Sequence, residues 1–196
     1  MEKATTIFKA AEEGNLKAVR ELLQSDPSLI NASGFEGATA LHYATWYNQR
    51  DVVKLLIENG ADVNAREDRD WTPLHMAANQ GLIQIAKLLL EKGANLGARS
   101  NLGATPLHFA AGEGQKAMAE LLIERGADMN AGSDNETTPL HEAVVERHPN
   151  LVELLCAKGA QVNSRDAIGL TPLQYAIPND LVEIADLLRK YGAIEE

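Results

Sequence analysis

The chain has 196 residues, of which 45% are hydrophobic and 23% are charged, a balance typical of soluble globular proteins. Its 28 acidic residues outnumber the 18 basic ones, and the net charge of −10 disfavours binding to nucleic-acid phosphates or anionic membranes. No apolar run approaches the roughly 18 residues of a membrane-spanning helix, and a single cysteine, Cys156, excludes an internal disulfide. We therefore expect a cytoplasmic protein with no nucleic-acid partner and no membrane partner.

A pattern of Thr, Pro, Leu and His recurs with a constant step of 33 residues. Its five copies begin at Thr39, Thr72, Thr105, Thr138 and Thr171, with Ala for Pro in the first copy and Gln for His in the last. Two further markers keep the same step, a leucine pair that begins with Leu55-Leu56 and a Gly-Ala pair that begins with Gly60-Ala61. Three markers in phase indicate an internal repeat, and a degenerate sixth unit precedes the five.

Each unit predicts two short helices. In one unit, Thr72 suits the N-cap and Pro73 the first helical position, where its missing N–H has no cost. Leu74 and Ala78 fall on one face of the first helix, and Gly93 ends the second. Each helix has about ten residues, and helices below about 12–15 residues are marginal alone in water. The pairs must therefore stack on their neighbours, which predicts a solenoid.

The 33-residue unit with its T-P-L-H-x-A signature resembles the ankyrin-repeat family over essentially the whole chain. The resemblance implies an all-α solenoid of stacked helix-turn-helix units with projecting β-hairpin turns. We expect one domain over residues 1–196, in which polar outer faces make the first and last units capping repeats. The expected repeats are residues 4–35, 36–68, 69–101, 102–134, 135–167 and 168–196.

Four histidines at one repeat position, His42, His75, His108 and His141, suggest a metal site. Stacked helices lie about 8–10 Å apart, however, whereas zinc needs its nitrogen ligands at about 2.0–2.1 Å. We therefore expect no metal and predict that each imidazole bonds to the backbone of an adjoining turn, as Gln174 can do in the last unit.

No sequence motif points to catalysis. Cys156 takes the place of Ile123 in the neighbouring unit, which predicts a small buried hydrophobe rather than a nucleophile. The chain has no G-x-S-x-G elbow, phosphate-binding loop or dinucleotide fingerprint. We expect no catalytic residues and no cofactor, and hence no enzyme activity.

Two turn asparagines, Asn64 and Asn130, resemble ankyrin sites that are hydroxylated in animal cells. The interpretation that we prefer is that these side chains stabilise the turns in which they lie. Gly97 replaces the asparagine in the third unit, which predicts a looser turn there.

In proteins that this chain resembles, partners bind at the hairpin tips and the outward face of the first helix of each unit. Both tryptophans of the chain lie at such positions, and exposed Trp and Tyr often dominate binding energy. An alternative is that Trp46 and Trp71 pack on each other and only stiffen the stack. The candidate partner-binding residues are Phe35, Glu36, Trp46, Tyr47, Asp68, Arg69, Trp71, Asn79, Gln80, Leu102 and Glu113.

The predicted turns carry more acidic than basic side chains. This excess favours a partner with a basic patch, while plain solubility explains it equally well. The acidic turn residues are Glu36, Glu67, Asp68, Asp70, Asp134, Glu136 and Asp166.

The sequence as a whole predicts a monomeric protein–protein interaction module, an adaptor or scaffold without catalytic activity. One alternative is a stoichiometric inhibitor or regulator of a specific enzyme. A second is an engineered binder on this scaffold, against which the second helices differ freely between units, as Val52-Val53-Lys54 and Ile85-Ala86-Lys87 illustrate.

Overall fold

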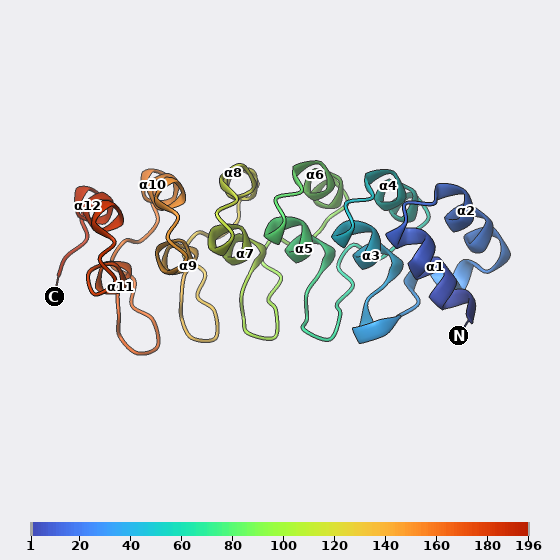
Figure 1. Cartoon of the computed structure of the whole chain (residues 1–196), viewed down its shortest axis with the longest axis horizontal. Helices are drawn as coiled ribbons and strands as arrows, with labels where there is room; N and C mark the ends of the chain where they lie inside the picture. Colours follow the sequence, from blue (N-terminus) through green and yellow to red (C-terminus); the bar gives the residue numbers. More distant parts are fainter. Residues whose placement is uncertain (1, 196) are drawn as a thin grey trace. The chain divides into compact units, whose positions relative to one another are not determined.

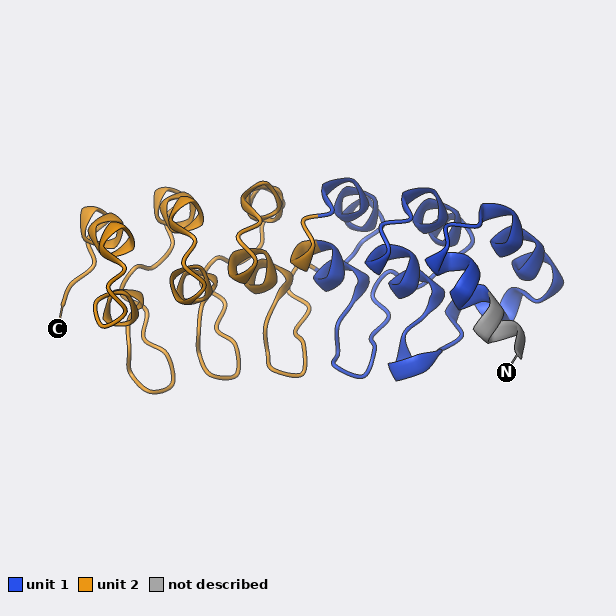
Figure 2. Cartoon of the chain, in the orientation of Figure 1, with its two compact units in different colours: residues 1–77, 82–95 blue, residues 78–81, 96–196 orange. Residues whose placement is uncertain are grey.

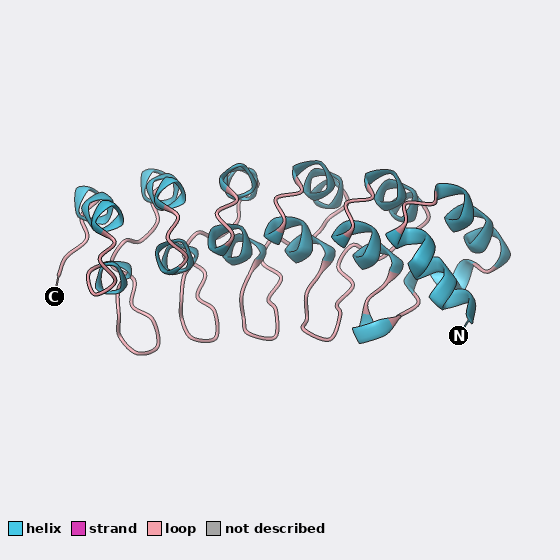
Figure 3. Ribbon diagram, in the orientation of Figure 1, coloured by secondary structure: helices cyan, strands magenta, loops and turns pink. Residues whose placement is uncertain are grey.

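A computed structural model describes residues 2–195 and the side chains of residues 7–195, so Met1 and Glu196 lie outside the described residues. Within this range the chain forms paired α-helices joined by turns and contains no β-strand (Figure 3). The α-helices are α1 (Glu2–Glu12), α2 (Leu16–Ser25), α3 (Ala40–Trp46), α4 (Arg50–Glu58), α5 (Pro73–Asn79), α6 (Ile83–Glu91), α7 (Pro106–Gly112), α8 (Lys116–Glu124), α9 (Pro139–Val145), α10 (Pro149–Ala157), α11 (Pro172–Ala176) and α12 (Val182–Lys190). Two short 3-10 helices, η1 (Pro27–Asn31) and η2 (Phe35–Gly37), lie between α2 and α3.

The chain divides into two compact units (Figure 2). Unit 1 holds residues 1–77 and 82–95, and unit 2 holds residues 78–81 and 96–196. In unit 1, α1 packs on α3, while α2 and α6 both pack on α4. In unit 2, α9 lies between α7 and α11, and α10 lies between α8 and α12. The second helices α8, α10 and α12 thus form one row and the first helices another, from which the loops project (Figure 1). This is the stacking that the repeat predicts.

The helix starts follow from the Thr-Pro pairs. Thr105 and Thr138 are N-caps with extended backbone, and each is followed by a proline at the first helical position. The backbone N–H of Thr105 donates to Nδ1 of His108 at 3.1 Å, which gives that amide an acceptor inside the fold. The predicted N-cap and helix start are confirmed at these positions.

The core is built from the framework leucines. The leucine of the T-P-L-H pattern is at most 1% exposed in all five units. Burying each such side chain stabilises the fold by roughly 1.5–3 kcal/mol. These leucines are Leu41, Leu74, Leu107, Leu140 and Leu173.

The projecting loops are tight turns rather than paired strands. In each loop one backbone N–H donates to a carbonyl four residues on, as from Glu67 to Trp71 at 3.1 Å and from Ser100 to Ala104 at 2.9 Å. Only the first loop carries even an isolated antiparallel bridge in the described residues, between Ser33 and Thr39. A second backbone bond closes the turn itself, as from the N–H of Asp70 to the carbonyl of Glu67 at 2.8 Å. The loops are therefore hairpin-like, but these bonds do not extend into the expected β-strand pairing.

Neighbouring loop tips are also joined through the backbone. The N–H of Asp68 donates to the carbonyl of Glu36 at 2.9 Å in unit 1. In unit 2, Asp134 donates to Leu102 at 3.0 Å. Each tip is thus held by its neighbour as well as by its own turn.

Turn asparagines link one repeat to the next. Oδ1 of Asn64 accepts the N–H of Asn95 at 2.8 Å, and its Nδ2 donates to the carbonyl of Gly93 at 3.1 Å. Oδ1 of Asn130 accepts the N–H of Gln161 at 2.8 Å. The interpretation that these side chains stabilise turns is confirmed. Gly97, at the corresponding position, has no side-chain amide with which to form such a link.

None of the described helices combines the length and the apolar character that a membrane crossing requires.

Candidate functional site

A cleft of about 170 Å³ opens in unit 1. It lies between the loop that contains η2, the outward face of α3 and the following loop. Aromatic side chains make up much of its wall. The lining residues are Phe35, Glu36, Ala38, His42, Tyr43, Trp46, Tyr47, Glu67, Arg69 and Met76.

The aromatic wall comes from the end of α3 and the tip of the preceding loop. Leu41 and Ala44 bury one face of α3, so Trp46 and Tyr47, at its C-terminal end, remain 43% and 47% exposed. Phe35, at the tip, is 76% exposed. Contiguous exposed apolar surface of this kind marks contact sites in soluble proteins.

The cleft is also lined by an ordered loop that Glu67 organises. The Glu67 side chain is 2% exposed, and its Oε1 accepts the N–H groups of Arg69 at 2.9 Å and Trp71 at 3.1 Å. Its Oε2 lies 3.3 Å from Nε of Arg69. The Arg69 guanidinium also lies 4.7 Å from the centroid of the Trp71 ring, within cation–π range. Arg69 is therefore held by a carboxylate and an aromatic face.

Tyr43 also lines the cleft and is not among the binding residues predicted from the sequence. Its ring stacks on Phe8 with centroids 5.3 Å apart, and burial raises the pKa of its phenol. Tyr43 precedes Trp46 by three residues and Tyr47 by four, the spacing of one helix face. That spacing was a usable signal. Met76 also lines the cleft, and no aromatic or charged pattern singles it out in the sequence.

The structure brings together five of the candidate residues, Phe35, Glu36, Trp46, Tyr47 and Arg69, around this one cleft. The exposed Asp68 and the half-buried Trp71 belong to the loop that carries Arg69.

The remaining candidates belong to unit 2. Nδ2 of Asn79 donates to Oε1 of Glu113 at 3.0 Å, so these two polar side chains bind each other. Gln80 is half-buried, and Leu102 projects from its loop with 71% of its surface exposed.

Two of the acidic turn residues, Glu67 and Asp166, do not face solvent. Both carboxylates are buried and accept N–H groups of their own turns. Asp166 also accepts the hydroxyl of Tyr175, and this bond raises the pKa of Tyr175 to about 12. Burial opposes ionisation of Asp166, but the bonds from Tyr175 and the backbone hold its pKa below the usual value.

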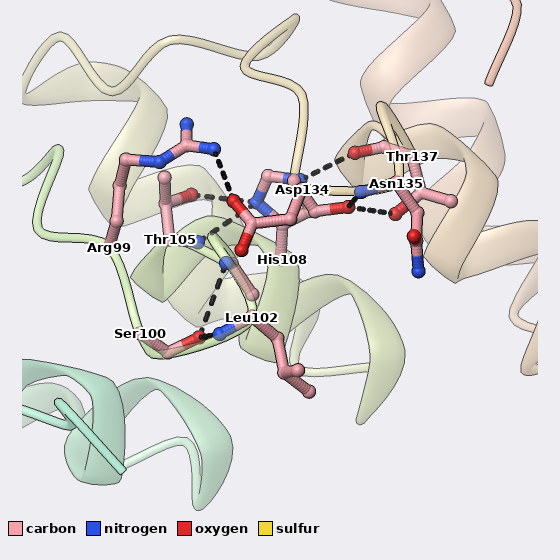
Figure 4. Close-up of polar contacts among 10 residues, drawn as sticks. Arg99, Ser100, Leu102, Thr105, His108, Asp134, Asn135 and Thr137 are labelled. Atoms are coloured by element: carbon pink, nitrogen blue, oxygen red, sulfur yellow. Dashed lines mark hydrogen bonds and ion pairs between the residues drawn. The ribbon is translucent and has the colours of Figure 1, made fainter. Parts of the chain in front are cut away.

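Another acidic turn residue of unit 2, Asp134, forms an ion pair with Arg99 of the neighbouring loop. The guanidinium of Arg99 lies 3.4 Å from Oδ1 of Asp134 (Figure 4). In the same loops Oγ of Ser100 accepts the N–H groups of Leu102 and Ala104, which places Ser100 in the role that Glu67 has in unit 1. The acidic character of the loop edge is therefore weaker than composition implies.

The repeat histidines bond between turns, as predicted. Nε2 of His42 lies 3.1 Å from the carbonyl oxygen of Trp71. The corresponding distances are 2.9 Å from His108 to Thr137 and 3.2 Å from His141 to Leu170. A carbonyl can only accept, so Nε2 carries the hydrogen. Burial lowers the pKa of all three imidazoles and so favours their neutral form. Among the described side chains of residues 7–195, no three His, Cys, Asp or Glu residues gather in a metal-binding arrangement.

Cys156 packs in the interior with 6% of its surface exposed. Burial raises the pKa of its thiol to about 11, so the side chain stays protonated at neutral pH. The prediction of a small buried hydrophobe is confirmed.

Segments of this chain are similar to several larger proteins. A stretch of 57 residues is 42% identical to "Palmitoyltransferase akr1" of Schizosaccharomyces pombe and covers 29% of this chain and 9% of that protein. Another stretch of 60 residues is 40% identical to "Serine/threonine-protein kinase VIK" of Arabidopsis thaliana and covers 31% of this chain and 14% of that protein. A third stretch of 64 residues is 42% identical to "NF-kappa-B inhibitor zeta" of Homo sapiens and covers 30% of this chain and 9% of that protein. The matches thus span a small fraction of each relative's length.

The family model described as "Ankyrin repeats (3 copies)" matches residues 2–67, 63–133 and 125–195, which together cover nearly the whole chain. The matched segments contain the paired helices and the Thr-Pro caps described above. The chain therefore belongs to the ankyrin-repeat family.

Proposed function

We propose that this chain is a non-catalytic interaction module that binds a protein partner through the cleft of unit 1 and the adjoining loop tips. The observation that carries the proposal is the group of exposed aromatic side chains, Phe35, Trp46 and Tyr47, around one cleft. Ankyrin repeats are generally protein–protein interaction modules, and Trp, Tyr and Arg dominate the energetics of such contacts.

The size of the cleft supports a macromolecular partner. Its volume of about 170 Å³ is below the roughly 300–1,000 Å³ of pockets that enclose a small molecule. It suits one projecting side chain of a larger surface. We further propose that the module acts as an intracellular monomer, in agreement with the buried thiol of Cys156.

The test is affinity capture from a lysate of the source cell with the native chain and the Phe35→Ala/Trp46→Ala/Tyr47→Ala variant. We expect the triple variant to bind its partner at least tenfold more weakly, because the loss of a single such anchor typically costs about 2 kcal/mol or more of binding free energy. Since these side chains lie outside the core, helicity and the thermal midpoint should change little.

A matched control replaces three exposed apolar residues of unit 2, Val145, Ile168 and Val182, by alanine. This variant should capture the same partner as the native chain. Equal capture by both triple variants and the native chain would contradict a site in the cleft.

A second candidate function is stoichiometric regulation of an enzyme. The similarity to a protein named as an inhibitor favours it, and inhibition could use the same surface. If the captured partner is an enzyme, titration with the purified chain should reduce its activity to an endpoint at one equivalent. If the enzyme keeps its full activity when the complex is fully formed, the chain is not its inhibitor and the adaptor function is favoured.

A further inference from the structure

We propose that the cleft of unit 1 receives the ammonium group of a lysine side chain on the partner polypeptide. This inference rests on the proposed function and names the chemistry of the group that enters the site.

The wall of the cleft suits a cation. Phe35, Tyr43, Trp46 and Tyr47 all line it, and a cation within about 6 Å of an aromatic centroid is attracted by the ring's quadrupole. The same loop already contains one such contact, because the Arg69 guanidinium lies 4.7 Å from the Trp71 ring.

The charge around the cleft points the same way. Glu36 lines the cleft from an exposed loop tip, with a left-handed φ of 52°. Its carbonyl accepts the N–H of Asp68, so the tip is fixed by its neighbour. Arg69 is the positive side chain of the lining, and its charge is balanced by Glu67 at 3.3 Å. The excess charge is therefore the negative one of Glu36, which complements an incoming ammonium.

The size of the cleft favours a single compact group. A volume of about 170 Å³ is too small for a drug-sized ligand but sufficient for the end of one side chain. A lysine ammonium is compact but strongly hydrated, so moving it from water into a cleft requires both aromatic faces and a carboxylate to replace its hydration. The cleft supplies both.

The test uses two peptides that differ in one atom. One carries lysine, and the other carries 2-aminoheptanoic acid, a neutral isostere in which a methyl group replaces the ammonium. The full chain is titrated with each, and the indole N–H resonances of Trp46 and Trp71 are followed by NMR. We expect saturable shifts and about three- to thirtyfold tighter binding of the cationic peptide. Equal binding, or no saturable shift with either, would overturn the inference.

Two variants with matched controls locate the effect. Trp46→Ala should abolish the preference for the cation, while Val145→Ala, at the equivalent and equally exposed position of a unit 2 repeat, should keep it. Glu36→Gln should reduce the preference several-fold, while Glu136→Gln, another exposed loop glutamate with left-handed φ, should not. Identical behaviour of a variant and its control would also overturn the inference.

The outcomes separate this inference from the proposed function. If the aromatic triple variant loses its partner but the two peptides bind equally, the cleft is a binding site without cation selectivity, and only the inference fails. If the triple variant keeps its partner, the proposed function fails as well. Co-sedimentation of the chain with phosphatidylcholine vesicles would identify a lipid ammonium as the occupant and would overturn the assignment to lysine.

Discussion

Thr45 is a fully buried threonine in α3 whose hydroxyl oxygen has no hydrogen-bond partner. The equivalent positions of the next three repeats hold Ala78, Ala111 and Val144, all apolar. An unsatisfied buried hydroxyl costs about 1–3 kcal/mol, so this residue lowers the stability of its repeat.

We expect Thr45→Val to raise the free energy of unfolding by about 1 kcal/mol, because valine fills the same space without a polar atom. For a chain of this length that corresponds to a rise of roughly 2–4 °C in the thermal midpoint, measurable by circular dichroism. The matched control is Thr39→Val in the same repeat, where the hydroxyl lies 2.9 Å from Nδ1 of His42. The free energy of unfolding of that variant should fall by about 1 kcal/mol. A decrease in both variants would contradict our account of Thr45.

At the scale of the helix and turn, the sequence predicted most of the fold because its signals are local. A threonine before a proline sets a helix start through bonds within three residues, and this held for α7 and α9. The burial of Glu67 and Asp166 was missed because a carboxylate in a polar turn normally faces water, and only the folded loop directs N–H groups at it. The packing of Tyr43 depends on Phe8, which is distant in sequence.

The asparagine links between repeats make a second testable element. Gly97 occupies the position where Asn64 and Asn163 each accept one backbone N–H and donate to one backbone carbonyl. We expect Gly97→Asn to stabilise the chain by about 1 kcal/mol, through added bonds and a less flexible unfolded state. The reverse change, Asn64→Gly, should destabilise it by about 1–2 kcal/mol. Urea midpoints measure both, and a decrease with Gly97→Asn would refute a simple linking role.

For the whole molecule, we expect the buried histidines to make stability depend on pH near neutrality. Burial lowers the pKa of His42, His108 and His141 below the value that they have in the unfolded chain. Below about pH 6.5 the unfolded chain therefore binds more protons, and the free energy of unfolding falls as the pH falls from 7 to 5. The slope is at most about 1.4 kcal/mol per pH unit for each histidine.

The control for this prediction is present in the chain itself. Gln174 stands at the histidine position of the last repeat, and its Oε1 accepts the N–H of Thr171 at 2.9 Å. A triple His→Gln variant at positions 42, 108 and 141 should fold and show a flatter dependence of the thermal midpoint on pH between 7 and 5. An unchanged slope would assign the pH dependence to other groups.

The position that bears Trp46 carries Asn79, Gly112 and Val145 in the next three repeats, while the leucine five residues earlier never changes. The residues that specify the fold and those of the proposed contact surface are thus different residues of the same short helix. Selection can rewrite one without disturbing the other. Ancestral copies of one repeat could therefore diverge toward new partners while the architecture stayed constant.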